Sequence, residues 1–149
     1  MSNILVFNNI LIEDIKIGME VSYTQTITDT DIKMFAGISG DRNPIHVDNN
    51  YAENSRYKKR IVHGMLTASF FSALFGTKIP GEGCLYVSQS LKFKRPVYIG
   101  DTVKASVIVT KVDLIKRRVF FRTICSVKNK IVTDGEAELY VPKNPNSLG

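Results

Sequence analysis

HGMLTASFFSALFG, residues 63–76, is the stretch on which the fold depends. Its composition favours a helix of roughly a dozen residues, about 18 Å long, that is apolar almost all round. Such a helix has no face that suits water, so it is expected to be buried on every side. The sequence therefore predicts a central helix that the rest of the chain wraps.

The wrapping layer follows in the sequence. One strand is predicted before the helix, at 20–27, and four after it, at 84–93, 101–112, 118–127 and 131–141. In the segment 101–112, valine and alanine alternate with threonine, lysine and serine, as in a strand with one buried face. Short connections favour an antiparallel meander, with Lys128 and Asn129 in a tight turn. We expect an α+β fold in which five antiparallel strands wrap one helix, and the open sheet edges favour a homodimer.

Length and composition limit the possible classes of protein. With 149 residues, 44% hydrophobic and 23% charged, the chain is expected to be one globular domain over 1–149, with its core at about 17–141 and a frayed tail at 142–149. Cys84 and Cys125 lack the spacing of a zinc knuckle or a disulfide framework, so the cytoplasm is the expected compartment. The longest nearly apolar segment, 65–75, is too short to span a membrane.

The net charge of +6 raises the question of a nucleic-acid partner. The two basic clusters, at 58–60 and 116–118, are short and have no recognition motif around them. We therefore expect a solvated basic surface and no nucleic-acid binding.

Before the central helix lies AGISGDRNPIHVD, residues 36–48. Thr28 is a predicted N-cap, with Asp31 completing a capping box, for a short helix that ends near Gly37 or Gly40. Pro44 disfavours the α conformation at the residue before it, so a bend is expected within the segment.

Asp41 and His46 lie on either side of that bend and can point at one spot. A carboxylate and an imidazole held together suit general acid and base catalysis. Two other interpretations stay open, because Asp41 could be a turn residue and His46 a satisfied core histidine. Asp48 is better explained as a helix cap, and with no third or fourth ligand in view no metal is expected.

Three runs carry a resemblance to a known family: FAGISGDRNPIHVD at 35–48, IVHGM at 61–65, and FKRPV at 93–97 followed by Gly100 and Asp101. Together they resemble the MaoC-like, (R)-specific enoyl-CoA hydratases of the hot-dog fold, and the similarity extends from about Ile17 to Val141. The resemblance implies a dimer whose sheets join. It also implies a hydro-lyase that reversibly hydrates trans-2-enoyl thioesters to (R)-3-hydroxyacyl thioesters without a metal or redox cofactor.

The resemblance also implies roles for single residues. Asp41 and His46 correspond to the catalytic pair that activates one water, with Asn43 as a supporting polar residue. The backbone N–H of Gly64 corresponds to the donor that faces the thioester carbonyl, and Ser72 to a serine near the carboxylate. One departure is visible: many relatives have Arg-Pro or Gly-Arg before Ile61, and here Lys59 and Arg60 precede it, which is expected to loosen the loop.

The chemistry itself favours the same arrangement. Hydration needs a base for the water and donors for an enolate-like oxyanion, and the free N–H groups at a helix start supply such donors. Gly64 suits this position because its missing Cβ is expected to let a substrate approach the backbone. The alternatives are a hot-dog acyl-thioesterase and a non-catalytic acyl-thioester binding or regulatory subunit. Coenzyme A and an acidic acyl carrier protein both suit the basic charge as carrier or partner, and the sequence does not choose between them. Nor does it say which of Asp41 and His46 is the acid and which the base.

Overall fold

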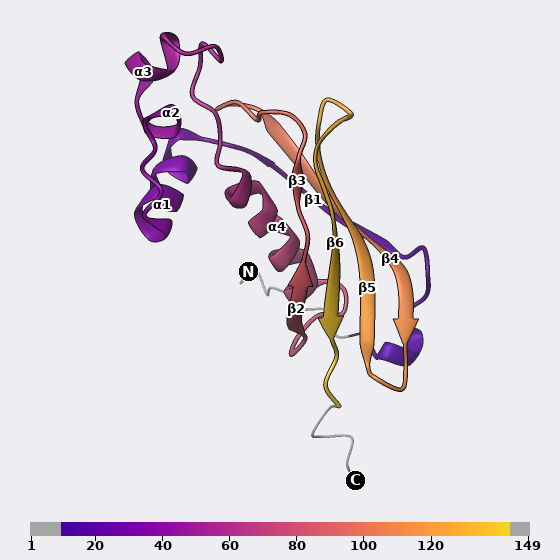
Figure 1. Cartoon of the computed structure of the whole chain (residues 1–149). Helices are drawn as coiled ribbons and strands as arrows, with labels where there is room; N and C mark the ends of the chain where they lie inside the picture. Colours follow the sequence, from indigo (N-terminus) through magenta and orange to yellow (C-terminus); the bar gives the residue numbers. More distant parts are fainter. Residues whose placement is uncertain (1–9, 144–149) are drawn as a thin grey trace, which may run out of the picture.

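The structure is a computed structural model and describes residues 10–143. A curved antiparallel sheet lies against helix α4 (Gly64–Thr77), and three short helices gather beyond one end of α4 (Figure 1). The strands are β1 (Glu20–Thr26), β2 (Leu85–Gln89), β3 (Lys92–Phe93), β4 (Thr102–Asp113), β5 (Arg118–Val127) and β6 (Lys130–Tyr140). The other helices are η1 (Ile12–Asp14), α1 (Asp29–Ser39), α2 (Pro44–Val47) and α3 (Asn49–Glu53).

The strand order confirms the α+β fold and corrects the expected meander. The sheet runs β1-β4-β5-β6-β2, with β3 also paired to β6. Only β4, β5 and β6 are consecutive neighbours, whereas β1 joins β4 and β2 joins β6 from a distance in sequence. The predicted turn between β5 and β6 is confirmed, since Lys128 and Asn129 have φ of 49° and 65°, the left-handed values of a tight hairpin.

The predicted strand 84–93 is two strands, and the break between them lies against Gly135 on β6. A Cβ at this position would lie 1.9 Å from the carbonyl oxygen of Ser90, so only glycine lets the two backbones approach. Ser90 donates its N–H to the carbonyl of Glu136 over 2.8 Å and accepts the N–H of Glu136 on its hydroxyl over 3.0 Å. The chain is thereby held against β6 between the end of β2 and the start of β3.

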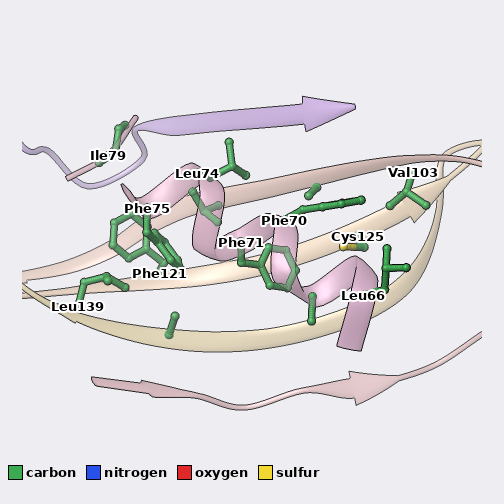
Figure 2. Close-up of a cluster of buried hydrophobic side chains, with 14 of the residues drawn as sticks. Leu66, Phe70, Phe71, Leu74, Phe75, Ile79, Val103, Phe121, Cys125 and Leu139 are labelled. Carbon is green, nitrogen blue, oxygen red and sulfur yellow. The ribbon is translucent and has the colours of Figure 1, made fainter. Parts of the chain in front are cut away.

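The core forms between α4 and the concave face of the sheet (Figure 2). The helix contributes large side chains that pack against inward-facing residues of β4, β5 and β6, and those labelled in Figure 2 include Leu66, Phe70, Phe71, Leu74, Phe75, Val103, Phe121, Cys125 and Leu139. Burial of each large apolar side chain stabilises the fold by about 1.5–3 kcal/mol. These contacts fix the position and rotation of α4, and with them the position of its first turn.

The expectation that α4 is buried on every side is wrong for the single chain. Met65 is 57% exposed, and Ser69, Ser72 and Ala73 on the same face are also exposed. The reason is that a sheet with two open edges covers only part of the helix circumference. Beside this face lies β2, an edge strand whose Leu85, Tyr86 and Val87 are exposed as well.

The helices before α4 follow the sequence signals closely. Thr28 and Asp31 form the predicted capping box at the start of α1, with hydrogen bonds of 3.2 and 2.9 Å, and Gly40 ends the helix at φ 80°. Asp48 caps α3, as expected, by accepting the N–H of Tyr51 over 3.1 Å. Of the helices within residues 10–143, none is long and apolar enough to cross a membrane.

Candidate active site

The segment between α1 and α3 lies near the N-terminal end of α4 (Figure 1), and its Asp41 and His46 line one cavity with the first turn of that helix. Asn43 is the N-cap of α2, accepting the N–H of Ile45 over 3.2 Å, and Pro44 occupies the first helical position. The N–H of Asn43 donates to Oδ1 of Asp41 over 3.2 Å. Asp41 is therefore held just outside α2 and His46 within it, and Asn43 supports both through its backbone and its cap.

His46 is held by one short hydrogen bond. Its Nδ1 lies 2.7 Å from the carbonyl oxygen of Ile61, and the residue is 9% exposed. Because a carbonyl oxygen only accepts, Nδ1 must carry the hydrogen, so the neutral ring keeps its lone pair on Nε2. That nitrogen lies 3.9 Å from Oδ2 of Asp41, too far for a direct hydrogen bond but suited to one bridging water.

His63 has the opposite arrangement. Its Nε2 lies 2.9 Å from the main-chain oxygen of Asp41 and must donate, while its Nδ1 is buried without a partner. Burial lowers the pKa of His63, against a smaller opposing effect of the hydrogen bond to Asp41, so the ring is neutral at pH 7. The rings of His46 and His63 stack at 3.9 Å between centroids. His63 thus anchors the backbone of Asp41 and supports the ring of His46.

Asp41 and His46 share a cavity of about 400 Å³ with the first turn of α4. Gly64 is the first residue of that helix and lines the cavity; at a helix start the N–H groups have no partner within the helix, and the side chain of His63 does not cap them. Three cations, Arg56, Lys94 and Arg95, also line it. The cavity therefore combines a carboxylate and an imidazole with the first turn of a helix and a basic wall of Arg56, Lys94 and Arg95.

The structure changes the explanation for glycine at position 64. We expected its missing Cβ to let a substrate approach, but a Cβ there would lie 2.5 Å from Cε1 of Phe93. The ring of Phe93 fills that space, and the residue is still 53% exposed, on the wall of the same cavity. Glycine lets β3 pack an aromatic ring on the first turn of α4, and an added Cβ would have to displace that ring.

Ser72 does not line the cavity of Asp41 and His46 within the single chain. It lines a separate, mainly apolar hollow of about 560 Å³ with Phe35, Tyr86 and Val87, and this hollow shares only Met65 with the cavity. The structure thus brings together Asp41, His46, Asn43 and Gly64, and it leaves Ser72 on the exposed face of α4.

Arg60 was missed by the sequence analysis, which assigned it to a solvated basic cluster. It is 6% exposed, and its guanidinium bonds the main-chain oxygen of His46 over 3.2 Å. The segment after Arg60, where the expected proline is absent, is held by two backbone hydrogen bonds: Ile61 donates to the carbonyl of Ile45 over 3.2 Å and Val62 to that of Val97 over 2.7 Å. Only the position of Arg60 directly before Ile-Val-His-Gly could have signalled its role.

Asp41, His46 and His63 are close enough to be considered as metal ligands, with one atom of each within 4.8 Å of the others. Their orientation fits a metal poorly. The rings of His46 and His63 stack at an interplanar angle of 27°, so their in-plane lone pairs run side by side and do not converge on one ion. His63 Nε2 is moreover already bound to the carbonyl of Asp41.

Comparison with known proteins places these features in a family. The family model described as MaoC like domain matches residues 13–136. The (R)-specific enoyl-CoA hydratase of Rhodospirillum rubrum is 54% identical over 130 residues, which cover 87% of this chain and 90% of that protein. The 3-hydroxybutyryl-CoA dehydratase of Methylorubrum extorquens is 42% identical over 131 residues, 88% of this chain and 83% of that protein.

Solved structures agree with the sequence relatives. The R-hydratase of Pseudomonas aeruginosa, in its unliganded form, superposes with a TM-score of 0.86 at 41% identity, over 91% of this chain and 88% of that one. The (R)-hydratase of A. caviae superposes with a TM-score of 0.85 at 35% identity, over 87% and 99%. The hot-dog fold implied by the sequence motifs is confirmed.

The packing of Phe93 on Gly64 predicts a specific pair of effects on stability. Gly64→Ala should lower the free energy of unfolding by about 1–3 kcal/mol through overpacking, and Phe93→Ala in the same chain should remove most of that loss. Gly76→Ala is the matched control in the same helix, because a Cβ there meets nothing within 4 Å and alanine favours a helix by up to about 1 kcal/mol. Urea unfolding of wild type, the three single variants and the double variant measures this, and a Gly64→Ala defect of equal size with and without Phe93 would contradict it.

The lowered pKa of His63 predicts a pH dependence of stability. In the unfolded chain the imidazole has its ordinary pKa of 6.5, so below that pH the unfolded state binds a proton that the folded state refuses. Above pH 6.5 this effect does not reduce the free energy of unfolding. Below pH 6.5 the free energy of unfolding falls as the pH drops, by at most about 1.4 kcal/mol per pH unit. Chemical unfolding at pH 7.5 and 5.5 should show a smaller fall for His63→Gln than for wild type, and equal falls would exclude this role of His63.

Proposed function

The chain belongs to the MaoC-like family, and we propose that it catalyses the reversible hydration of trans-2-enoyl thioesters to (R)-3-hydroxyacyl thioesters. The proposal depends on one observation above all: Asp41 and His46 face the same cavity as the first turn of α4. Two relatives of this chain are an (R)-specific enoyl-CoA hydratase and a 3-hydroxybutyryl-CoA dehydratase, which are named for opposite directions of such a reaction. Asp41, His46 and the N–H groups at the start of α4 are the groups that either direction requires.

The gap of 3.9 Å between His46 Nε2 and Asp41 Oδ2 suits the attacking water. A water there donates one hydrogen bond to the lone pair of Nε2 and one to the carboxylate, so its oxygen lone pairs are free to face the β carbon. As the oxygen bonds to the β carbon, Nε2 takes a proton, and the electron pair of the double bond moves toward the carbonyl oxygen. Asp41 stabilises the imidazolium that forms.

The developing negative charge on the thioester oxygen needs donors, and the first turn of α4 offers them. Gly64 lines the cavity as the first residue of the 14-residue helix, so its N–H and the positive end of the helix are the proposed donors. Return of the proton from the pair to the α carbon completes the addition. The other hydrogen of the water stays on the new hydroxyl group at the β carbon. No metal or redox group takes part in this proposal.

The basic wall of the cavity is an argument for a carrier of the acyl group that bears phosphate. Arg56 stacks on the ring of Tyr57 at 4.8 Å, Arg95 donates to the carbonyl of Ile131 over 2.8 Å, and Lys94 lies 3.8 Å from Asp134. All three cations line the cavity that holds the pair. Coenzyme A and the phosphopantetheine arm of an acyl carrier protein share the anionic phosphate chemistry that such a wall would bind.

The exposed face of α4 and the edge strand β2 support a homodimer. Leu85, Tyr86, Val87 and Met65 present apolar surface around the hollow that contains Ser72. A second copy joined at β2 would extend the sheet and cover this face. A mass of 16.7 kDa by sedimentation equilibrium, that of one chain, would rule out the dimer.

Two further expectations remain proposals. A single domain accounts for the described residues, because α4 and all the long strands contribute to one core. The cytoplasm remains the proposed compartment, since Cys84 and Cys125 are both free thiols.

Substitution of the proposed pair tests the mechanism. With crotonyl-CoA, wild type should remove the enone absorbance and yield (R)-3-hydroxybutyryl-CoA, whereas Asp41→Asn and His46→Gln should each lower kcat by about a hundredfold or more while the fold is kept. Free thiol release would instead indicate a thioesterase, and binding without turnover a non-catalytic subunit. Near-wild-type rates in both variants would remove the mechanism.

A substrate without phosphate tests whether the basic wall binds the phosphate of the carrier. Arg56→Ala combined with Lys94→Ala should lower kcat/KM for crotonyl-CoA about tenfold, mainly through KM, since about 1.4 kcal/mol of carrier binding is lost. Crotonyl-pantetheine has no phosphate, so its kcat/KM should not change. Lys104→Ala is the control, an exposed lysine of β4 outside the cavity lining. An equal loss with both substrates would contradict phosphate binding by this wall.

A further inference from the structure

Arg60 is a buried cation at the junction of three short helices. Its Nη2 lies 2.7 Å from Oδ1 of Asp29, the first residue of α1. Its Nε donates to Oδ1 of Asn49, the first residue of α3, over 2.8 Å, and its Nη1 donates to the carbonyl oxygen of His46 in α2 over 3.2 Å. One guanidinium therefore joins the segment before the catalytic loop, the loop itself and the segment after it.

The residue after Arg60 completes the hold on His46. The carbonyl of Ile61 receives the Nδ1 hydrogen of His46, and the N–H of Ile61 donates to the carbonyl of Ile45 over 3.2 Å. Arg60 and Ile61 thus hydrogen-bond the backbone of α2 at His46 and Ile45, and Ile61 also hydrogen-bonds the imidazole ring of His46. A shift of Arg60 would move the acceptor that sets the tautomer of His46.

The chemistry of these contacts requires arginine. A buried cation is tolerated only when a counter-charge and hydrogen-bond acceptors surround it, and Asp29 is that counter-charge. Hydrogen bonds from Lys33 and, second, from Arg60 lower the pKa of Asp29 and keep it ionised. The planar fork of arginine reaches three acceptors in three directions, whereas a lysine ammonium at the same position is a single compact charge.

We propose that Arg60 is a positioning residue for the hydration: it acts through His46, by fixing α2 so that Nδ1 stays on the Ile61 carbonyl and Nε2 stays directed at Asp41. This inference rests on the proposed function. A purely structural Arg60 would stabilise the fold and leave the folded enzyme's turnover unchanged, so the two roles differ in kcat.

The test uses Arg60→Met, Arg60→Lys and Asp29→Asn in the full chain. With crotonyl-CoA we expect Arg60→Met to lower kcat by about tenfold or more with KM within about threefold, because small displacements of a catalytic group are costly to the reacting geometry. Arg60→Lys should retain an intermediate kcat. Asp29→Asn should lower kcat in wild type and add nothing in Arg60→Met, since Asp29 is proposed to act on His46 only through Arg60. Arg122→Met is the control, because it removes an exposed arginine that pairs with Asp134 outside the cavity.

A second readout is independent of turnover. The chain has two histidines, so NMR of ¹⁵N-histidine-labelled protein shows two imidazoles, those of His46 and His63. Arg60→Met and Asp29→Asn should weaken the Nδ1–H tautomer of His46 and leave His63 unchanged. Should Arg60→Met not fold, Arg60→Lys and Asp29→Asn decide the question alone.

Wild-type kcat and an unchanged His46 tautomer in the folded variants would overturn the positioning role. Failure of the wild-type enzyme to hydrate any enoyl thioester would instead overturn the proposed function, and the NMR readout would still show whether Arg60 holds His46.

Discussion

The hydrogen bond from His46 Nδ1 to the carbonyl oxygen of Ile61, 2.7 Å long, is the interaction on which the rest of the site depends. It leaves the ring lone pair on Nε2, facing Asp41 across a gap suited to one water. The second histidine reinforces this arrangement, because His63 donates to the carbonyl of Asp41 and, neutral, stacks on the His46 ring without adding a charge. Backbone carbonyls thereby set the tautomer of both imidazoles.

The fold places Asp41 and His46 beside the first turn of α4. Packing of α4 against the concave sheet fixes where its first turn lies, and the helices α1 to α3 overhang that turn (Figure 1). Phe93 on β3 closes the other side, against the bare Cα of Gly64. The first turn of α4, the side chains of Asp41 and His46, and the basic wall thus come from separate elements that meet at one cavity, and one face of α4 stays exposed.

Local signals in the sequence were sufficient for much of this. The apolar run at 63–76 predicted α4, the capping box at Thr28 predicted α1, and the bend at Pro44 correctly separated Asp41 from His46. Contacts between distant residues could not be obtained the same way. Arg60 has the same local sequence signals as a solvated arginine, and only the fold brings Asp29 and Asn49 to it. The Phe93 ring on Gly64, the β2–β6 pairing and the exposed face of α4 depend likewise on how the sheet curves, which no local pattern encodes.

The most direct test of the account is the tautomeric state of the two histidines in the untagged protein at neutral pH, by long-range ¹H–¹⁵N correlation of the imidazoles. We expect opposite tautomers: His46 with its hydrogen on Nδ1, and His63 with its hydrogen on Nε2. A His46 ring protonated on Nε2 alone would present no lone pair to the water and would contradict the mechanism derived from this geometry.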